Sequence, residues 1–566
     1  MAMTMHDART PATPVLAIEG LTITLPAGAD RAHAVRDVSI TLAPGRIGCL
    51  VGESGSGKSV IASAVMGLLA PGLRVAGGSI RLQGEELVGA TPARLRALRG
   101  RTMAMVFQEP MTALNPVMRC GEQIEEMLAA HEPIDAAERK ARVLAILQQV
   151  QLPEPERIYA AFPHQLSGGQ RQRIVIAIAL ILGPALLICD EPTTALDVTT
   201  QAEILALIRT LQAERGTAVL FITHDFGVIA EIADEVVVLR HGQVVEQGAK
   251  DAVLRAPAQP YTRALLAAVP RLDANDRDGP DEDRLLPDVR GLQKTYPGHG
   301  GWRRKPPVHA VHEVSFVLRA GETIGIVGES GSGKSTVARC VTRLIEPSAG
   351  EVRLAGQPVH ALRGAALSAF RRSVQIVFQD PYGSLNPRRT VGDSIVEGPL
   401  NFGVPKAVAW ARARELMGLI HLSPDALRRY PSEFSGGQRQ RLCIARALAC
   451  EPTVLVADAA VSALDVSVQA QILALLQEVQ QRLALGIVFI THDLRVASQV
   501  CDRVIVMHRG RVVEQGSAHE VLLHPREAYT RRLLDAAPGR GYRFGACAAP
   551  LHAIDRPQAG AAGLAV

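Results

Sequence analysis

The spacing of apolar residues predicts strands that alternate with helices along the whole chain. A polar start gives way near Leu16 to the alternating pattern of half-buried strands, and Ile47 to Val51 is a short apolar run. A glycine-rich turn follows, and then a helical pattern rich in Ala, Val and Ile up to about Leu69. Ala185 to Asp190 and Val219 to Ile222 are further apolar runs of strand length. This alternation favours a mostly parallel α/β sheet.

A charge-rich region with a helical pattern interrupts these strands. It begins after Val106 to Pro110 and extends to about Gln151, and Leu166 to Arg173 then opens a long apolar helix. We expect the region between them to form a helical subdomain beside the sheet.

The second half of the chain repeats the first in the same order. The paired positions are Lys58 and Lys334, Gln108 and Gln379, Ser167 and Ser435, Asp190 and Asp458, and His224 and His492. The repeat predicts a first domain at residues 15–270 and a second at 291–537. Residues 271–290, rich in Asp, Glu, Pro and Gly, are expected to form an exposed linker. Residues 1–14 and 538–566 are expected to be disordered tails.

Length and composition agree with a protein of two globular domains. A chain of 566 residues exceeds what one ordinary core holds. Its net charge of +5 comes with scattered basic residues, so charge indicates neither a nucleic acid nor an anionic membrane surface as a partner. The eight cysteines have no C-x-x-C pair and no metal-ligand spacing, which favours buried free thiols in a reducing compartment.

The hydropathy pattern predicts neither a secretory signal nor a membrane span. Residues 1–14 lack an apolar signal region. The longest apolar run, Ile174 to Cys189, is interrupted by Gly183 and Pro184 and is too short to cross a bilayer. If the protein works at a membrane, another chain must supply the span.

Two identical glycine-rich stretches carry the strongest chemical signal. Gly52 to Ser59 and Gly328 to Ser335 both read Gly-Glu-Ser-Gly-Ser-Gly-Lys-Ser and fit the phosphate-loop pattern G-x-x-x-x-G-K-[ST]. The glycines let backbone N–H groups turn toward phosphate oxygens, Lys58 reaches the terminal phosphates, and the Ser59 hydroxyl can ligate Mg²⁺. One copy could be a chance match in a Gly/Ser-rich turn, but a second perfect copy makes that negligible.

Together these motifs resemble the ATP-binding cassette family, with two nucleotide-binding domains fused in one chain. Leu166 to Arg173 and Phe434 to Arg441 resemble the signature sequence of the family, and the likeness covers nearly all of residues 15–535. The resemblance implies two tandem α/β domains, each with a RecA-like core and a helical subdomain, and ATP and Mg²⁺ as cofactors. It also implies that each signature completes the ATP site of the other domain. Ala195 to Asp197 and Ala463 to Asp465 resemble the D-loops of the family, through which each site would sense the other.

Site one, as the resemblance implies it, joins the first phosphate loop with the second signature. Glu191 can orient or deprotonate the attacking water, and His224 would contact the γ-phosphate. The expected ATP-binding residues are Gly52, Glu53, Ser54, Gly55, Ser56, Gly57, Lys58, Ser59, Val60, Ser435, Gly436, Gly437 and Gln438. The expected Mg²⁺ ligands are Ser59, Gln108 and Asp190, and the expected catalytic residues are Glu191, His224 and Gln108.

Site two joins the second phosphate loop with the first signature, but it departs from the family pattern. The first domain reads Asp190-Glu191-Pro192, whereas the second reads Asp458-Ala459-Ala460, and a methyl group cannot accept a proton. Losing a positioned general base costs about 10² to 10⁴ in rate, so we expect site two to bind ATP and Mg²⁺ but to hydrolyse poorly. The expected ATP-binding residues are Ser167, Gly168, Gly169, Gln170, Tyr296, Gly328, Glu329, Ser330, Gly331, Ser332, Gly333, Lys334, Ser335 and Thr336; the metal ligands are Ser335, Gln379 and Asp458, and the catalytic residue is His492.

Several of these residues have plain structural alternatives. A lone histidine after an apolar strand, such as His224 or His492, is usually structural, and Gln108 and Gln379 could be ordinary loop glutamines. Their repetition in a shared context favours the functional interpretation. Tyr296 stands at the distance where the family places an adenine-stacking aromatic, but it could also be an ordinary edge tyrosine.

Three features resemble one branch of the family: the ATPase subunits of bacterial dipeptide, oligopeptide and nickel importers, including fused forms linked to glutathione uptake. They are the Gly-Glu-Ser-Gly-Ser-Gly-Lys loops, Gln379 to Pro387, and Tyr261 to Leu266. The resemblance implies a peripheral subunit that powers an importer from the cytoplasmic face of the inner membrane. Its partners would be two transmembrane permease subunits and an extracytoplasmic solute-binding protein, which together carry a peptide-type solute. Cys547 stands alone where this branch often has a cysteine cluster, so no iron–sulfur cluster is expected.

Two other classes of protein share part of this pattern. A soluble twin-cassette factor acting on ribosomes or nucleic acid would have the ATP motifs, but also a long charged helical linker and basic extensions. Here the linker is short and acidic. Ala459 would suit a non-hydrolytic regulatory protein, but the intact Asp190-Glu191 pair argues against that class.

Overall fold

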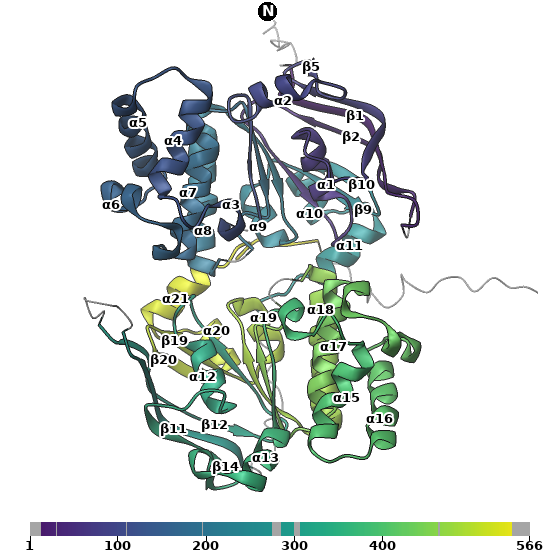
Figure 1. Ribbon diagram of the computed structural model, residues 1–566, viewed down its shortest axis with the longest axis vertical. Helices are drawn as coiled ribbons and strands as arrows, with labels where there is room; N and C mark the ends of the chain where they lie inside the picture. Colours follow the sequence, from purple (N-terminus) through teal and green to yellow (C-terminus); the bar gives the residue numbers. More distant parts are fainter. Residues whose placement is uncertain are drawn as a thin grey trace, which may run out of the picture.

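A computed structural model of the chain describes residues 13–29, 31–108, 110–194, 196–273, 285–298, 306–461 and 464–545. Each half contains a six-stranded sheet, a four-stranded sheet and a helical region, and the halves lie one above the other in Figure 1. The predicted fold class, two tandem phosphate-loop domains of α/β type, is therefore confirmed. Three parts of the sequence-based prediction lie outside the described residues. They are most of the expected N-terminal tail, the centre of the linker, and the expected C-terminal tail from residue 546, which includes Cys547.

The six-stranded sheet of the first domain is built from short apolar strands in the order β10-β9-β3-β8-β7-β6. All neighbours pair in parallel except β10, which is antiparallel to β9. β3, β7 and β8 are buried at every position, which explains their continuous apolar sequence. The strands are β3 (Ile47–Val51), β6 (Met103–Val106), β7 (Leu186–Asp190), β8 (Ala218–Ile222), β9 (Glu235–Arg240) and β10 (Gln243–Ala249).

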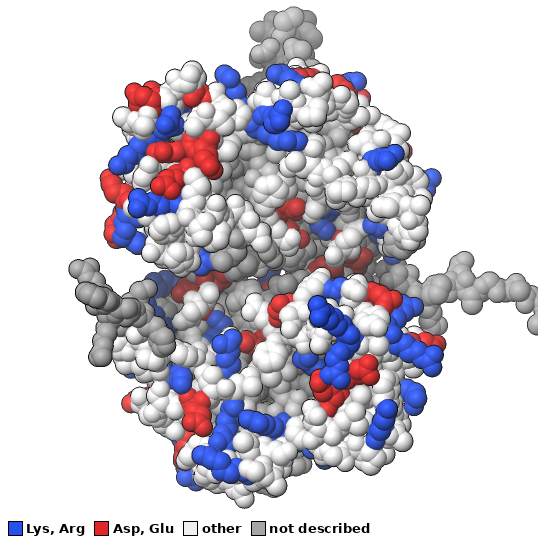
Figure 2. All heavy atoms as spheres, viewed as in Figure 1, with Lys and Arg blue, Asp and Glu red and all other residues white. Residues whose placement is uncertain are grey.

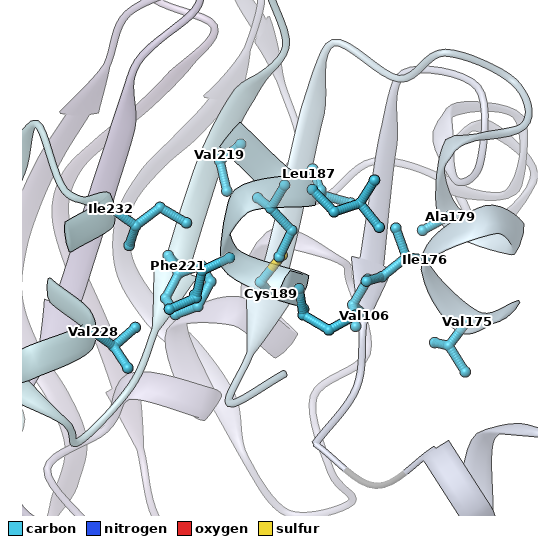
Figure 3. Packing of buried hydrophobic residues seen from close by; sticks show 14 of the residues in the cluster. Val106, Val175, Ile176, Ala179, Leu187, Cys189, Val219, Phe221, Val228 and Ile232 are labelled. Carbon is cyan, nitrogen blue, oxygen red and sulfur yellow. The ribbon is translucent and has the colours of Figure 1, made fainter. Parts of the chain in front are cut away.

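The two faces of this sheet are covered differently. The antiparallel sheet β2-β1-β4-β5 and helix α1 (Lys58–Val65) share one apolar core with it, in which Leu50, Ile61 and Leu220 are buried. On the other face, Phe221 and Cys189 pack against α7 (Gly168–Leu180) and α9 (Phe226–Ile232) (Figure 3). The antiparallel strands are β1 (Leu16–Thr24), β2 (His33–Leu42), β4 (Arg74–Leu82) and β5 (Glu85–Glu86), and the nearby helices are α2 (Pro92–Leu98), α8 (Val198–Arg215), α9 (Phe226–Ile232), α10 (Lys250–Arg255) and α11 (Pro260–Ala267).

The charge-rich region forms the expected helical subdomain, visible beside the first sheet in Figure 1. Its apolar side chains Ile124, Val143 and Ile146 are buried in the same core as Phe221 and Cys189 of the sheet. The helices are α3 (Pro110–Ala113), α4 (Cys120–His131), α5 (Ala136–Gln149), α6 (Pro155–Ala160), the short 3-10 turn η1 (Pro163–Gln165) and α7 (Gly168–Leu180).

The second domain repeats this architecture with sheets β16-β17-β18-β13-β19-β20 and β12-β11-β14-β15. Its strands are β11 (Leu285–Tyr296), β12 (Val308–Arg319), β13 (Thr323–Val327), β14 (Ala349–Leu354), β15 (Gln357–Pro358), β16 (Val374–Val377), β17 (Val454–Asp458), β18 (Gly486–Ile490), β19 (Arg503–His508) and β20 (Arg511–Ser517). Its helices are α12 (Lys334–Val341), η2 (Val359–Ala361), α13 (Gly364–Ser373), α14 (Pro381–Ser384), α15 (Val391–Asn401), α16 (Lys406–Leu419), η3 (Pro424–Arg428), η4 (Pro431–Glu433), α17 (Gly436–Leu448), α18 (Val466–Leu483), α19 (Leu494–Val500), α20 (Ala518–Leu523) and α21 (Ala528–Asp535).

Two segments expected to be linker or tail have a definite place. Residues 285–290 form the start of β11, so regular structure begins inside the predicted linker. Residues 538–545 cross to the first domain, where Tyr542 and Phe544 pack against its core and Gly545 N donates to Leu254 O at 2.8 Å. The expectation of disorder from residue 538 was therefore wrong for 538–545. The aromatic pair in this segment supplies apolar contact that the surrounding Gly, Ala and Pro residues do not.

The seven described cysteines are buried free thiols, in agreement with the cysteine pattern. Burial raises the pKa of Cys120 and of Cys443 to about 11, which keeps these thiols protonated and unreactive at neutral pH. Within the described residues, no helix combines the length and apolar character needed to cross a membrane.

Candidate functional site

Each phosphate loop connects a buried strand to a helix, at the carboxyl edge of the large sheet. In the first loop, Gly57 has a φ of 102°, and a Cβ there would lie 2.8 Å from Ala34 O, so only glycine fits. Lys58 Nζ donates to Gly52 O at 2.8 Å and to Glu53 O at 3.0 Å. Burial lowers the pKa of Lys58, because the lysine is enclosed by its own loop.

The second loop has the same geometry. Lys334 Nζ donates to Gly328 O and Glu329 O, both at 2.7 Å. Burial lowers the pKa of Lys334 to about 8, with carboxylates of both domains acting in the opposite direction. Both lysine ammonium groups are therefore held by carbonyl oxygens of their own phosphate loops.

A serine and an aspartate meet beside each lysine. Ser59 Oγ donates to Asp190 Oδ1 at 3.1 Å, and Ser335 Oγ donates to Asp458 Oδ1 at 3.1 Å. Burial raises the pKa of both carboxyl groups, although the serine bonds oppose it. A hydroxyl and a carboxylate oxygen side by side next to a phosphate loop form the donor set that Mg²⁺ prefers. The described residues contain no cluster of three or more His, Cys, Asp or Glu side chains that suits a metal ion.

Glu191 follows β7 and collects three donors in site one. His224 Nδ1 lies 3.2 Å from Oε1, while Gln108 Nε2 and Thr194 Oγ1 each donate to Oε2 at 2.9 Å. Burial raises the pKa of Glu191, but the hydrogen bonds from His224 and Thr194 and the charges of His224 and Lys58 together outweigh burial and leave the pKa below its usual value. Burial would lower the pKa of His224, and the interaction with Glu191 reverses this and raises it. The carboxylate is therefore ionised at neutral pH and fixed in orientation.

Site two keeps the backbone of this arrangement and lacks its carboxylate. Ala459 has a φ of 48°, close to the 47° of Glu191, and its N–H donates to Ile490 O as that of Glu191 donates to Ile222 O, both at 2.9 Å. Without a neighbouring glutamate, burial lowers the pKa of His492. The pKa values of the two histidines are therefore shifted in opposite directions, and only site one has a carboxylate at this position.

The nucleotide cavities also differ. Site one is a cavity of about 230 Å³ lined by the first phosphate loop, Gln108, Glu191 and His224. Site two is a cavity of about 550 Å³ in which Tyr296 lies with the second phosphate loop, Gln379 and His492.

The strand pairing near the expected base-binding end is the same in the two domains. Tyr296 pairs with Val308 in site two, while Leu25 N bonds to Ala32 O at the matching place in site one. Tyr296 lines the cavity of site two, whereas Leu25, at the matching position of the first domain, is not among the described residues that line the cavity of site one.

The signature residues form helix starts. Ser167 Oγ accepts from Gln170 N and Ser435 Oγ accepts from Gln438 N, both at 3.3 Å, at the first turns of α7 and α17. Among the described residues that line the site one cavity, the second domain contributes Asp465 and no residue of its signature. The structure therefore leaves the predicted contact between signature and nucleotide as a prediction.

The domains instead meet through phosphate loops and D-loops. Asp465 Oδ2 accepts from Ser54 N at 3.2 Å, and Ser467 Oγ donates to Glu53 Oε1 at 2.5 Å. The same contacts occur at site two, where Asp197 Oδ2 accepts from Ser330 N at 3.3 Å and Thr199 Oγ1 donates to Glu329 Oε1 at 2.8 Å. Two of these acceptors, Glu53 and Glu329, are among the residues predicted to bind ATP; their carboxylates accept hydrogen bonds from the other domain, and their contact with ATP stays a prediction.

Sequence reasoning missed Thr199 and Ser467, although a signal existed. Each follows a D-loop aspartate by two positions, in the repeated pattern Asp-Val-[Ser/Thr]. Ala195 and Ala463 of the D-loops lie outside the described residues.

Comparisons with known proteins identify the family of this chain. The ABC transporter family model matches residues 35–194 and 311–462, and the model of the oligopeptide/dipeptide transporter C-terminal region matches residues 245–295. Glutathione import ATP-binding proteins GsiA of Escherichia coli O6:H1 and of Shigella boydii serotype 4 are each 46% identical over 570 residues, covering 94% of this chain and 91% of the relative. Among solved structures, the dimeric bacterial ABC transporter cassette MJ0796 has 29% identity and a TM-score of 0.38, over 42% of this chain and 98% of its own. The chain therefore belongs to the ABC transporter family and is one of its ATP-binding subunits, with two fused cassettes.

Proposed function

We propose that this protein hydrolyses ATP at site one, holds ATP at site two, and thereby powers the import of a peptide-type solute. The observation that carries the asymmetry is the carboxylate of Glu191, with its three donors, against the methyl group of Ala459 in the same backbone conformation. The extensive identity with proteins named for glutathione import supports the direction of transport and the class of solute.

The residues of site one suit an attack by water on the terminal phosphate. The carboxylate of Glu191 accepts the proton of the water and orients it, because its pKa keeps it ionised at neutral pH. Lys58 neutralises charge on the terminal phosphates, and His224, held by Glu191, presents its ring to the same cavity. Ser59 and Asp190 would hold Mg²⁺, which supplies charge neutralisation between the outer phosphates.

Site two would bind the same nucleotide without turning it over at a useful rate. Lys334, Ser335 and Asp458 reproduce the phosphate and metal contacts of site one. Tyr296 on the cavity wall offers an aromatic face on which adenine can stack.

Transport would require partners that span the membrane. Gln108 and Gln379 each precede an exposed side chain near the helical subdomain. Val117, after Gln108, is 82% exposed, and Tyr382, after Gln379, is 63% exposed. We propose that two permease subunits dock on these segments at the cytoplasmic face of the inner membrane, and that an extracytoplasmic solute-binding protein delivers the solute. Closure and reopening of the cassettes would then drive the permeases.

Nucleic acid is not proposed as a partner. Basic and acidic side chains are interspersed over the visible face of both domains in Figure 2, whereas a nucleic-acid-binding protein needs a continuous basic surface.

Isolation of the tagged chain from gently solubilised membranes tests the proposed function. We expect two multi-spanning subunits to co-purify and the complex to take up labelled peptides in reconstituted vesicles. Recovery with ribosomes, or uptake that does not depend on this chain, would contradict the proposal.

A further inference from the structure

The two helical subdomains present matched surfaces at the starts of helices α4 and α15 (Figure 1). In the first domain, Cys120 N at the start of α4 donates to Ala161 O at 2.9 Å. In the second, Val391 N at the start of α15 donates to Arg429 O, also at 2.9 Å. The same backbone hydrogen bond therefore brings residues 117–118 close to 160–161 in one domain, and residues 388–389 close to 428–429 in the other.

In the first domain this surface consists of small or apolar side chains. Val117 is 82% exposed, Ala160 is exposed, Met118 is half-buried and Ala161 is buried. We call these four residues the apolar patch. A hollow of about 660 Å³ opens at Ala160 and Ala161. Exposed apolar surface beside a hollow fits a partner that brings apolar side chains of its own.

The second domain has an arginine at each of the four matching positions. Arg388, Arg389, Arg428 and Arg429 are all exposed, and we call them the arginine patch. Within the part of the chain that the structure describes, the ion pairs of this patch are limited to the one between Arg389 and Glu397. The other three guanidinium groups are therefore available to an acidic partner.

The surrounding charges increase the difference between the two surfaces. Residues 115–126 and 154–165 of the first domain contain two basic and five acidic side chains, a net charge of −3. Residues 386–397 and 422–433 of the second contain four basic and four acidic side chains, and the four basic ones form the arginine patch. The first surface therefore repels an acidic segment, and the arginine patch attracts it.

Anionic lipid head groups are the other chemistry that exposed arginines bind. The two surfaces occupy equivalent places in the repeat, and head groups offer no apolar contact to Val117 or to the hollow beside it. A protein partner suits both surfaces, because its two subunits can differ in sequence.

We propose that the two cassettes dock different permease segments, an apolar one on the apolar patch and one with exposed Asp or Glu side chains on the arginine patch. The inference rests on the proposed importer function. An apolar segment on the second domain would bury arginines without partners, and an acidic segment on the first would meet a negative surface. The two patches therefore determine which cassette serves which permease.

Photo-crosslinking of the assembled complex identifies the two partners directly. A photoreactive amino acid is placed at Pro116 or at Pro387, which are matched and exposed positions next to the patches. Mass spectrometry should assign the crosslink from Pro387 to an acidic cytoplasmic segment of one permease, and the crosslink from Pro116 to an apolar segment of the other. Phospholipid as the main product at Pro387, or segments of the same chemistry at both positions, would overturn the inference.

Charge reversal measures what the arginine patch contributes to docking. Arg388→Glu combined with Arg428→Glu should lower the amount of the acidic permease that co-purifies by about tenfold. Changing the acidic residues of the crosslinked segment to Lys should then restore it. Arg511→Glu combined with Arg526→Glu is the matched control, because it changes the charge equally at exposed arginines elsewhere in the second domain.

Salt dependence separates the two patches without any substitution. Raising the salt concentration from about 0.1 M to about 1 M shortens the Debye length from about 10 Å to about 3 Å. The permease on the arginine patch should dissociate from the complex at a lower salt concentration than the permease on the apolar patch. Release of both permeases at the same salt concentration would contradict the proposed difference.

Failure of the proposed function gives a different result. If the chain is not an importer subunit, neither Pro116 nor Pro387 crosslinks to a membrane-spanning protein. If only this inference fails, both positions crosslink to permeases, but Arg388→Glu combined with Arg428→Glu retains as much permease as the control.

Discussion

Arg495 of the second domain and Asp225 of the first form an ion pair of 3.0 Å across the domain interface. The same guanidinium lies 2.9 Å from Asp493 and donates to Pro538 O at 3.1 Å, and its side chain is 11% exposed. The repeat pairs Arg495 with Gly227, where a Cβ would lie 2.5 Å from the guanidinium. Arg495 thus links the two domains, and the absence of a side chain at Gly227 leaves space for its guanidinium.

Replacing Arg495 with alanine should strongly destabilise the interface. Asp225 and Asp493 would be left facing each other without a cation, and breaking a buried pair in this way costs about 3 to 5 kcal/mol. Urea unfolding of the full chain measures the change. Arg482→Ala, which removes an exposed pair with Glu478, is the control and should cost less than about 1 kcal/mol. An equal loss in the free energy of unfolding for both variants would show that the interface ion pair contributes no more to stability than an exposed pair.

The segment 538–545 should hold the second domain to the first. Tyr542 Oη donates to Asp251 Oδ1 at 2.6 Å, and the guanidinium of Arg255 lies 4.9 Å from the centre of its ring. Tyr542→Ala should therefore cost about 1 to 2 kcal/mol and speed proteolysis of the C-terminal segment. Tyr430→Ala changes an exposed tyrosine of the helical subdomain and should leave that rate unaltered. Identical cleavage in both variants would mean that the segment is not anchored there.

The features that the sequence predicted correctly are those set by local motifs. The phosphate loops, the serine–aspartate pairs and the Glu191–His224 arrangement were predictable because each motif fixes its own backbone and lies at the edge of a buried parallel strand. The resemblance pointed to Asp197 at the interface, and the repeated Asp-Val-[Ser/Thr] pattern marks Thr199, but their partners Ser330 and Glu329 were not predictable, because the choice of partner depends on how the two halves dock. The docking of residues 538–545 escaped prediction for the same reason, since a Gly/Ala/Pro-rich segment gives no local sign of its partner.

Restoring the missing carboxylate should activate site two. Ala459 already has the backbone conformation of Glu191, so Ala459→Glu needs no rearrangement and brings a carboxylate toward His492. ATP turnover by the assembled complex should rise, and the pKa of His492 should rise with it. Ala459→Gln, which has the same size without charge, is the control and should give no gain. Equal turnover in Ala459→Glu and the unaltered chain would count against the assignment of site two.

The charge pair of site one predicts a pH-dependent stability. Glu191 raises the pKa of His224, so protonated His224 stabilises the fold fully below about pH 6.5, and this contribution disappears as pH rises through the folded pKa. In Glu191→Gln, the pKa of His224 loses the contribution of Glu191 that raises it, and burial, the largest cause, acts to lower it against the smaller contribution of Asp225. The melting temperature of Glu191→Gln should therefore fall further below that of the unaltered chain at pH 6 than at pH 8. Glu478→Gln is a surface control without pH dependence, and an equal deficit at both pH values would contradict the pairing.

The most direct measurement is the steady-state ATPase rate of the assembled complex, with the unaltered chain compared with Glu191→Gln. Loss of essentially all activity is the predicted result, because the variant lacks the general base on which turnover by the complex depends. If about half of the activity survives, another group serves site two, and the asymmetric account of the two sites is wrong.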